Sequence, residues 1–270
     1  MKKIDTLIIS GASITSSPWF TWADIVIEIL NPREVINLSA RGVGNYYITL
    51  SCLKALSETK SKSVLCMPMF TTIDKFDMYI PPDKILSYLE QKHRPWQLTA
   101  EPAQKNTDGF WSTGSHWPEV KQLYHDNFFN TSISAVNNIL LFHGLNAYCK
   151  ENQIDLIPLF DSNIWNLLEY DLNSYVTGTP LLDRQLLDDS LVSSFKHLLG
   201  PQWTEFTSLI NYAIDNNLEF YNQLNKMHPP SNVHLLWTNE IVLPLLDQRF
   251  DCLPLTTQFL DKIERFSKEW

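Results

Sequence analysis

One serine stands where a nucleophile would be expected, directly after an apolar strand. Residues 8–15 read Ile-Ile-Ser-Gly-Ala-Ser-Ile-Thr, so a strand expected to be buried passes straight into a turn of small residues that contains Ser13. A hydroxyl on such a turn can attack a carbonyl carbon, and the free amides of a following helix can stabilise the resulting oxyanion. Pro18 suits the first turn of that helix, which is predicted to run through Trp22 to Leu30. Ser13 is therefore the candidate nucleophile.

The hydroxyls of this stretch also suit a structural role. Side-chain oxygens often accept hydrogen bonds from the free amides at a helix N-terminus. On this stretch alone, capping of the first helix is the simpler interpretation for Ser10, Ser13, Thr15 and Ser16. Catalysis requires a second group that can take the proton from Ser13.

His228 stands in the run Met-His-Pro-Pro-Ser-Asn, directly before a helix predicted from Val233 through Leu246. The two prolines restrict the backbone beside the histidine, which favours a rigidly held imidazole. His143 falls on the apolar face of a helix predicted over residues 132–152, and we expect it to be packed there.

Four apolar runs predict the strands that would position these residues. Helical patterns separate the runs, and this alternation is typical of an α/β fold with a parallel sheet. The carboxyl ends of parallel strands lie at one edge of the sheet, so we expect the loops of Ser13, Gly42 and Thr71 to meet there. The four runs are residues 4–10, 34–39, 63–70 and 154–160.

The loop after the second strand is rich in glycine, with Gly42 and Gly44 preceding a helix. It lacks the three-glycine spacing of a dinucleotide-binding turn. A better use for it is to direct a backbone amide toward Ser13.

Periodicity fades between about 81 and 130, where prolines and glycines interrupt any longer element, and we expect an insertion there. Its aromatic run over residues 109–117 would either cover a substrate or plug the core. In the first case Trp111 and Trp117 would suit stacking on a sugar. The stretch from about 162 to 224 is predicted to be helical, with short helices up to Gly200 and another helix from Trp203 to Leu224.

Composition limits the class of protein. The chain has 270 residues, of which 44% are hydrophobic and 12% aromatic, enough for an extensive core. Its net charge of −9 and pI of about 5.2 argue against nucleic acid or an anionic membrane surface as the main partner. No apolar run is long enough to span a bilayer, and residues 1–5 lead into a strand without the apolar core of a signal peptide. We expect a cytoplasmic globular protein.

The cysteines fit the same class. Cys52, Cys66, Cys149 and Cys252 are far apart and mostly lie in apolar segments, as reduced core thiols do. No paired spacing of cysteine and histidine suggests zinc. We expect no disulfide, no metal and no cofactor.

Together these motifs resemble those of the SGNH or GDSL-like hydrolase family, along most of the chain. Ser13 in Gly-Ala-Ser matches the family's serine in Gly-Asp-Ser, Gly42 matches its oxyanion glycine, and His228-Pro229 matches the His-Pro of its last block. The resemblance implies a three-layer α/β/α sandwich with a central parallel sheet, a flavodoxin-like fold. Residues 1–270 would form it as a single domain.

Three positions depart from the family's pattern. Ala12 replaces an aspartate that fixes the loop, which leaves the nucleophile in place. The family's asparagine after the third strand has no clear counterpart, and Thr71 or Thr72 stands in that neighbourhood; Thr71 and Asn45 are the candidates for the remaining oxyanion donor. Asn225 replaces the aspartate that precedes the histidine by three residues.

The change at Asn225 has a physical consequence. An amide can orient the imidazole but cannot stabilise its charge, and loss of the acid in a related triad costs about four orders of magnitude in turnover. A backbone carbonyl could hold the ring instead, or Asp161 or Asp74 could approach it from another strand end.

The resemblance implies a serine ester hydrolase, an esterase or O-deacylase acting on a small-molecule or carbohydrate ester through a Ser-His dyad or an altered triad. Ser13 would attack, His228 would transfer the proton, and the amides of Ser13 and Gly42 would hold the oxyanion. Two alternatives stay open. One is a binding protein on the same fold without turnover, and the other is an acyltransferase with the same acyl-enzyme chemistry.

Overall fold

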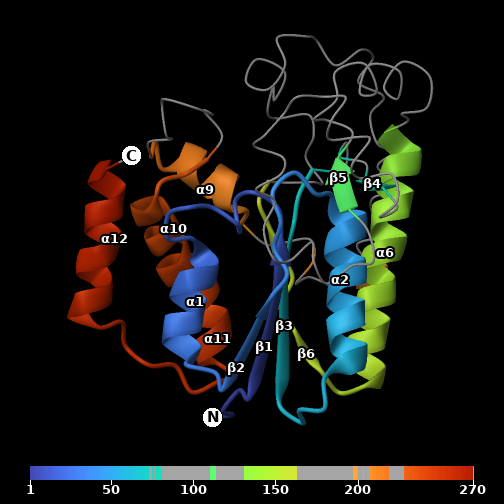
Figure 1. The fold of residues 1–270 in the computed structure, drawn as a ribbon, viewed down its shortest axis with the longest axis horizontal. Coiled ribbons are helices and arrows are strands. Elements are labelled where there is room, and N and C mark those ends of the chain that lie inside the picture. Colours follow the sequence, from blue (N-terminus) through green and yellow to red (C-terminus); the bar gives the residue numbers. More distant parts are fainter. Residues whose placement is uncertain are drawn as a thin grey trace.

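The computed structural model describes residues 1–72, 75, 77–80, 110–113, 131–162, 197–199, 203, 207–218 and 228–269 (Figure 1). The strands in these residues are β1 (Thr6–Gly11), β2 (Glu34–Asn37), β3 (Val64–Phe70), β4 (Asp77–Ile80), β5 (Phe110–Thr113), β6 (Asp155–Leu156) and β7 (Leu159–Phe160). The helices are α1 (Trp22–Leu30), α2 (Asn45–Glu58), α6 (Thr131–Glu151), α9 (Leu209–Asp215), α10 (Ser231–Trp237), the π-helical η4 (Thr238–Val242), α11 (Leu243–Asp247) and α12 (Thr257–Glu269).

A parallel sheet in the order β2-β1-β3-β6 forms the centre of the fold, and β7 also pairs with β3. Ile8 in β1 is in register with Ile36 on one side and with Cys66 on the other. The four predicted strands are all observed, and the last is split in two. The predicted α/β fold with a parallel sheet is confirmed.

The split between β6 and β7 has a local cause. Ile157 still donates its amide to the carbonyl of Cys66, but Pro158 has no amide hydrogen to continue the ladder. Pro68 lies inside β3 and is likewise unable to donate. Two prolines on neighbouring strands therefore interrupt the pairing without ending β3.

Apolar side chains alternate between the two faces of the sheet, and helices cover both (Figure 1). On one face Ile8, Cys66 and Phe70 pack into a core with α2 and α6. On the other, Leu7 and Met67 pack with α1, α9 and α10. β1 and β3 are buried on both faces, which explains their continuous apolar sequence.

Helix α1 begins later than its sequence predicts. Its N-cap is Thr21, which forms a capping box with Asp24, and Pro18 lies in the preceding loop. The prediction that Pro18 lies in the first turn of the helix is wrong, because the capping box makes Thr21 the N-cap and Trp22 the first helical residue. None of the four hydroxyls considered as caps fills that role.

Helix α6 presents a different face to the core from the one its apolar pattern predicts. His143 is exposed and Leu140 is 59% exposed, so the prediction that His143 is packed is wrong. The buried face includes polar residues, among them Asn138, whose Oδ1 accepts from Asn45 Nδ2 of α2 at 2.7 Å. Because tertiary hydrogen bonds satisfy these polar groups, the helix turns them inward.

The helix predicted from Trp203 is also shorter than expected. Ser208 caps α9 by accepting from the amide of Asn211, so this helix begins at Leu209. The helix predicted over 233–246 is observed as α10, η4 and α11 in succession. Its π-helical turn ends at Val242, two residues before Pro244, which cannot donate to the carbonyl four residues before it.

Two further features complete the fold. β4, which directly precedes the predicted insertion, pairs antiparallel with β5 from within it; most of residues 81–130 and 162–224 lies outside the described residues. The predicted C-terminal amphipathic helix is observed as α12, which buries Phe259 and Ile263.

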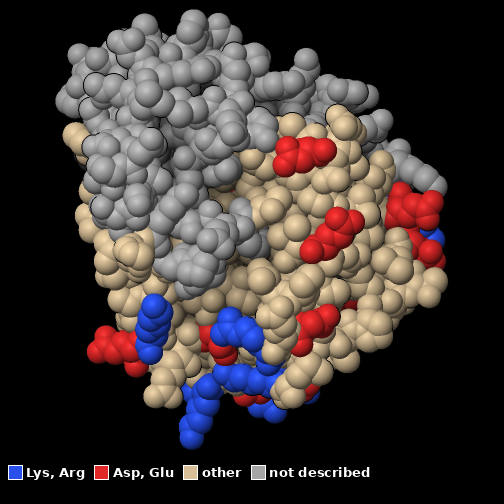
Figure 2. All heavy atoms as spheres, turned by 180° about the vertical axis from the view of Figure 1, so that it is seen from behind, with Lys and Arg blue, Asp and Glu red and all other residues tan. Residues whose placement is uncertain are grey.

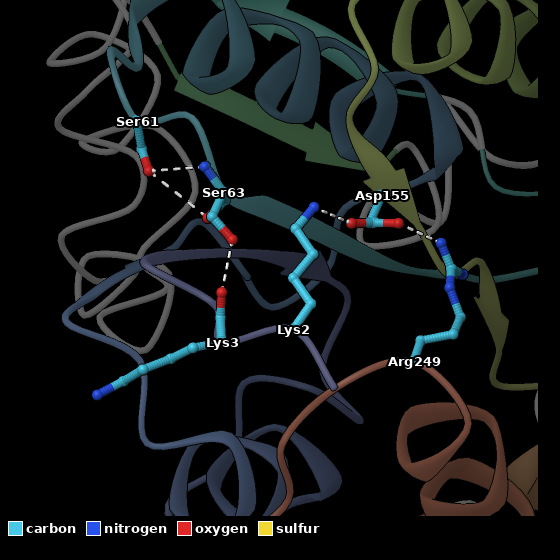
Figure 3. A network of polar contacts seen from close by, with 6 residues as sticks. All are labelled: Lys2, Lys3, Ser61, Ser63, Asp155 and Arg249. Atoms are coloured by element: carbon cyan, nitrogen blue, oxygen red, sulfur yellow. Dashed lines mark hydrogen bonds and ion pairs between the residues drawn. The ribbon is translucent and has the colours of Figure 1, made fainter.

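Charged groups tie together the edge of the sheet where the strands begin (Figure 3). Asp155 pairs with Lys2 at 2.7 Å and with Arg249. On the face seen in Figure 2, most Lys and Arg side chains gather at the end that carries the N-terminus in Figure 1. No helix among the described residues has the length and apolar composition that a membrane span requires.

Candidate active site

Ser13 lies in a tight turn at the carboxyl end of β1. The amides of Thr15 and Ser16 both donate to the carbonyl of Ala12 at 3.0 Å, which closes the turn around Ser13. Thr15 Oγ1 donates to the sulfur of Met69 at 3.4 Å and fixes the turn to the end of β3. The Trp22 indole, at the start of α1, donates to Thr15 Oγ1 at 3.2 Å, so both the sheet and α1 hold the turn.

The structure brings Ser13 and His228 together across 215 residues of sequence. Ser13 Oγ lies 2.9 Å from His228 Nε2, and both residues are half-buried. His228 precedes the buried Pro229 and Pro230, the second of which is the N-cap of α10. The Trp19 ring meets the imidazole edge-on, with centroids 6.0 Å apart. This is the contact that a nucleophile and its base require.

The surroundings of His228 keep its ring neutral. Burial lowers the pKa of His228 to about 4, and the positive charges of Lys75 and Arg41 act in the same direction. At pH 7 the imidazole is uncharged. Nε2 can then accept the Ser13 proton if the ring carries its own hydrogen on Nδ1.

A carboxylate that would orient the ring is not found among the described residues, where no ion pair joins His228 to an acid. Asp161 is buried beyond the end of β7 and accepts a hydrogen bond from Ser162 at 2.8 Å. Asp74 and Asn225, the other predicted partners, lie outside the described residues.

The loop of Gly42 lies against the turn of Ser13. The amide of Ala40 donates to the carbonyl of Gly11 at 3.0 Å, and Arg41 Nε donates to the carbonyl of Ser16 at 3.0 Å. Gly42 has a φ of 71°, a conformation that glycine adopts without strain. Neither the Ser13 amide nor the Gly42 amide donates a hydrogen bond to any described residue, as donors reserved for an oxyanion would require.

The structure gives Asn45 a different role from the predicted oxyanion donor. Its Nδ2 donates both to the carbonyl of Thr71 and to Asn138, which uses both amide hydrogens. Its Oδ1 accepts from the Thr71 amide at 2.8 Å, so that amide is occupied too. Asn45 and Thr71 thus brace β3 against α2 and α6, because a buried amide is stable only when its hydrogen bonds are satisfied.

Asp77 is a structural residue that the sequence did not reveal. Its carboxylate accepts from the amides of Gly44 at 2.5 Å and Tyr47 at 2.8 Å, and so caps α2 from β4. Burial raises the pKa of Asp77 to about 6, although the amides and Lys75 oppose this shift. A Cβ atom at Gly44 would lie 2.9 Å from the carbonyl of Lys75, so this close approach requires glycine.

A second histidine lies near the site without a sequence signal. His234 is 1% exposed, and its Nδ1 accepts from the amide of Trp22 at 3.2 Å. Burial lowers its pKa to about 3, and the neighbouring charge of His228 adds to the shift. His234 therefore holds the start of α1 against α10.

Arg41 and Lys75 are the other residues that sequence reasoning missed. Both follow strands whose carboxyl ends carry candidate site residues. This position in the sequence could have identified them as site residues. Lys75 Nζ donates to Thr71 Oγ1 at 2.6 Å. Of the predicted sugar-stacking residues, Trp111 lies in β5 and Trp117 lies outside the described residues.

Two other kinds of site were sought in the described part of the chain. A groove of about 490 Å³ runs between β2 and α2, but neither Ser13 nor His228 lines it. No group of three His, Cys, Asp or Glu side chains in these residues is arranged to hold a metal ion.

Comparisons with models of protein families, with curated proteins and with solved structures found no match. The function therefore has to be inferred from the geometry of the site.

Proposed function

We propose that this protein is a serine ester hydrolase in which Ser13 is the nucleophile and His228 is the general base. The observation that carries the proposal is the 2.9 Å contact between Ser13 Oγ and His228 Nε2 at the carboxyl edge of the parallel sheet. The amides of Ser13 and Gly42, which donate to no described residue, support it, because acyl transfer requires donors for the oxyanion.

The reaction would proceed in two halves. Ser13 Oγ bonds to the ester carbonyl carbon as its proton passes to His228 Nε2, and the carbon–oxygen bond to the alcohol then breaks as that proton moves to the leaving oxygen. Water next attacks the acyl-serine, again giving its proton to His228. The acid is released, and the proton returns to Ser13.

The charges around the site would have opposite effects on the two ions formed in the intermediate. Lys75 and Arg41 disfavour an imidazolium at His228, as its lowered pKa indicates. The same cations favour a negative oxygen beside Ser13. Turnover would therefore depend more on stabilisation of the oxyanion than on a strong base.

The family and substrate belong to the same proposal. We propose a divergent member of the SGNH or GDSL-like hydrolases, with their three-layer sandwich, acting as an esterase or O-deacylase on a small-molecule or carbohydrate ester. Parallel strands with helices on both faces, and a serine after β1, support this assignment.

A fluorophosphonate probe tests the nucleophile directly. The wild-type protein should be labelled at Ser13, and Ser13→Ala should abolish labelling while the urea midpoint stays within error. Ser57→Ala is the matched control, since this exposed serine lies near the far end of α2. Labelling that persists in Ser13→Ala would refute the role of Ser13.

A ligand-binding protein without turnover is the second candidate. It is favoured by the lack of an ion pair between His228 and any described carboxylate and by the lowered pKa of the ring. The double variant Ala12→Asp/Asn225→Asp restores both family carboxylates and should raise esterase turnover. No activity in either protein would favour the binding role.

A further inference from the structure

Two cations flank the candidate nucleophile from different loops. Arg41 follows β2, and its Nε holds the carbonyl of Ser16 in the turn of Ser13. Lys75 follows β3, and its Nζ holds the hydroxyl of Thr71. Both bonds go to neutral oxygens, so the two side chains are positioned without being neutralised.

Some cations in the described residues are paired with acids. Lys2 and Arg249 share Asp155 (Figure 3), and Lys54 pairs with Glu58 on the surface of α2. Arg41 and Lys75 form no ion pair with any described carboxylate. Their position distinguishes them: Arg41 holds the turn of Ser13, and Lys75 holds Thr71 beyond the end of β3.

Two acidic groups near the carboxyl edge of the sheet, Asp77 and Asp161, already accept hydrogen bonds. Asp77 lies near enough to Lys75 for the two charges to interact, but its oxygens accept from the α2 amides of Gly44 and Tyr47. Asp161 is 4% exposed and accepts from Ser162. The positive charges of Arg41 and Lys75 can therefore act on a molecule bound next to Ser13 and His228.

We propose that the site selects an ester that carries an anionic group, a carboxylate or a phosphate, which Arg41 and Lys75 bind. This inference rests on the proposed hydrolase function and adds a substrate class to it. Arginine suits a planar or tetrahedral anion through its paired donors, and lysine adds a mobile point charge. The positive charges of both side chains lower the pKa of His228, which supports their placement at the site.

A matched pair of esters tests the proposal. Hydrolysis of para-acetoxybenzoate and of its methyl ester is measured through the release of the phenol. To correct for intrinsic reactivity, the kcat/KM of each ester is divided by the rate constant for hydrolysis of that ester by hydroxide without protein. The anionic ester should be preferred at least about tenfold, which corresponds to about 1.4 kcal/mol. Arg41→Gln and Lys75→Gln should each reduce the preference, and the double variant should bring it close to one.

Conservative variants and a remote control separate charge from structure. Arg41→Lys and Lys75→Arg should keep most of the preference, because each retains the charge. Arg265→Gln, on the exposed side of α12, removes one positive charge away from the site and should leave the preference unchanged. Added salt should lower the preference of the wild-type protein, since mobile ions screen exposed charges.

A binding measurement keeps this inference distinct from catalysis. Calorimetry compares para-hydroxybenzoate with its methyl ester on Ser13→Ala, with and without Arg41→Gln. Tighter binding of the anion that depends on Arg41 supports anion recognition even if no ester is cleaved, in which case only the hydrolase proposal fails. Equal hydrolysis of both esters, or equal binding of both phenols, overturns the anion proposal while leaving the role of Ser13 to the probe experiment.

Discussion

A methyl group added at Gly11 should disrupt the turn that presents Ser13. The new Cβ atom would lie 2.2 Å from Thr15 Oγ1 and 2.7 Å from Thr15 Cβ, so Thr15 would have to move. Thr15 is 4% exposed, and its hydroxyl accepts from the Trp22 indole at 3.2 Å and donates to Met69. Moving it would leave the buried indole N–H unpaired.

The size of the effect follows from these two costs. An unsatisfied buried donor costs about 1–3 kcal/mol, and overpacking of a tight site costs about as much again. Gly11→Ala should therefore lower the free energy of unfolding by about 2–5 kcal/mol, measured by urea denaturation. Labelling of Ser13 by a fluorophosphonate should fall in parallel, because the same turn carries the nucleophile.

The chain supplies a control of the same chemical type. Gly144 lies inside α6, and an added Cβ would meet nothing within 4 Å. Gly144→Ala should stabilise the protein by up to about 1 kcal/mol, because alanine has the higher helix propensity. If Gly11→Ala changed stability by less than about 0.5 kcal/mol, or both variants moved it in the same direction, the packing account of this turn would be wrong.

Three shorter predictions follow from the titrating groups. The kcat/KM of the wild type should fall only near pH 4, because proton transfer needs neutral His228 with its pKa of about 4, and Lys75→Gln should move this limb to higher pH because it removes a cation. Asp77→Ala should cost about 0.5–2 kcal/mol in urea denaturation through loss of the α2 cap; an unchanged midpoint would contradict that role. The pKa of His234 falls from its ordinary value of 6.5 to about 3 in the folded protein. Its contribution to the free energy of unfolding is therefore complete above pH 6.5 and falls by about 1.4 kcal/mol per pH unit between pH 6.5 and about pH 3. Asp77 opposes this trend below about pH 6 because its pKa is raised, and His234→Gln should flatten the acid dependence of the urea midpoint.

The sequence alone was sufficient for the sheet and for the pair at its edge. Continuous apolar runs predicted β1 and β3 because strands buried on both faces exclude polar residues. Ser13 and His228 could be named because a small-residue turn after the first strand and a histidine before two prolines are local signals. Their proximity was expected from the resemblance to the SGNH or GDSL-like hydrolases.

The tertiary structure decided how polar groups are used. Asn138 turns inward on α6 because Asn45 donates to it across the fold, and no periodicity in the sequence reports such a partner. Asp77 caps a helix that begins more than thirty residues earlier in the chain, and Arg41 reaches back to the turn of Ser13. Apolar burial depends on one residue's own chemistry and can be read from its pattern. A buried hydrogen bond, or the electrostatic field of charged side chains at a site, depends on two or more groups. The distance between these groups is fixed only when the chain has folded.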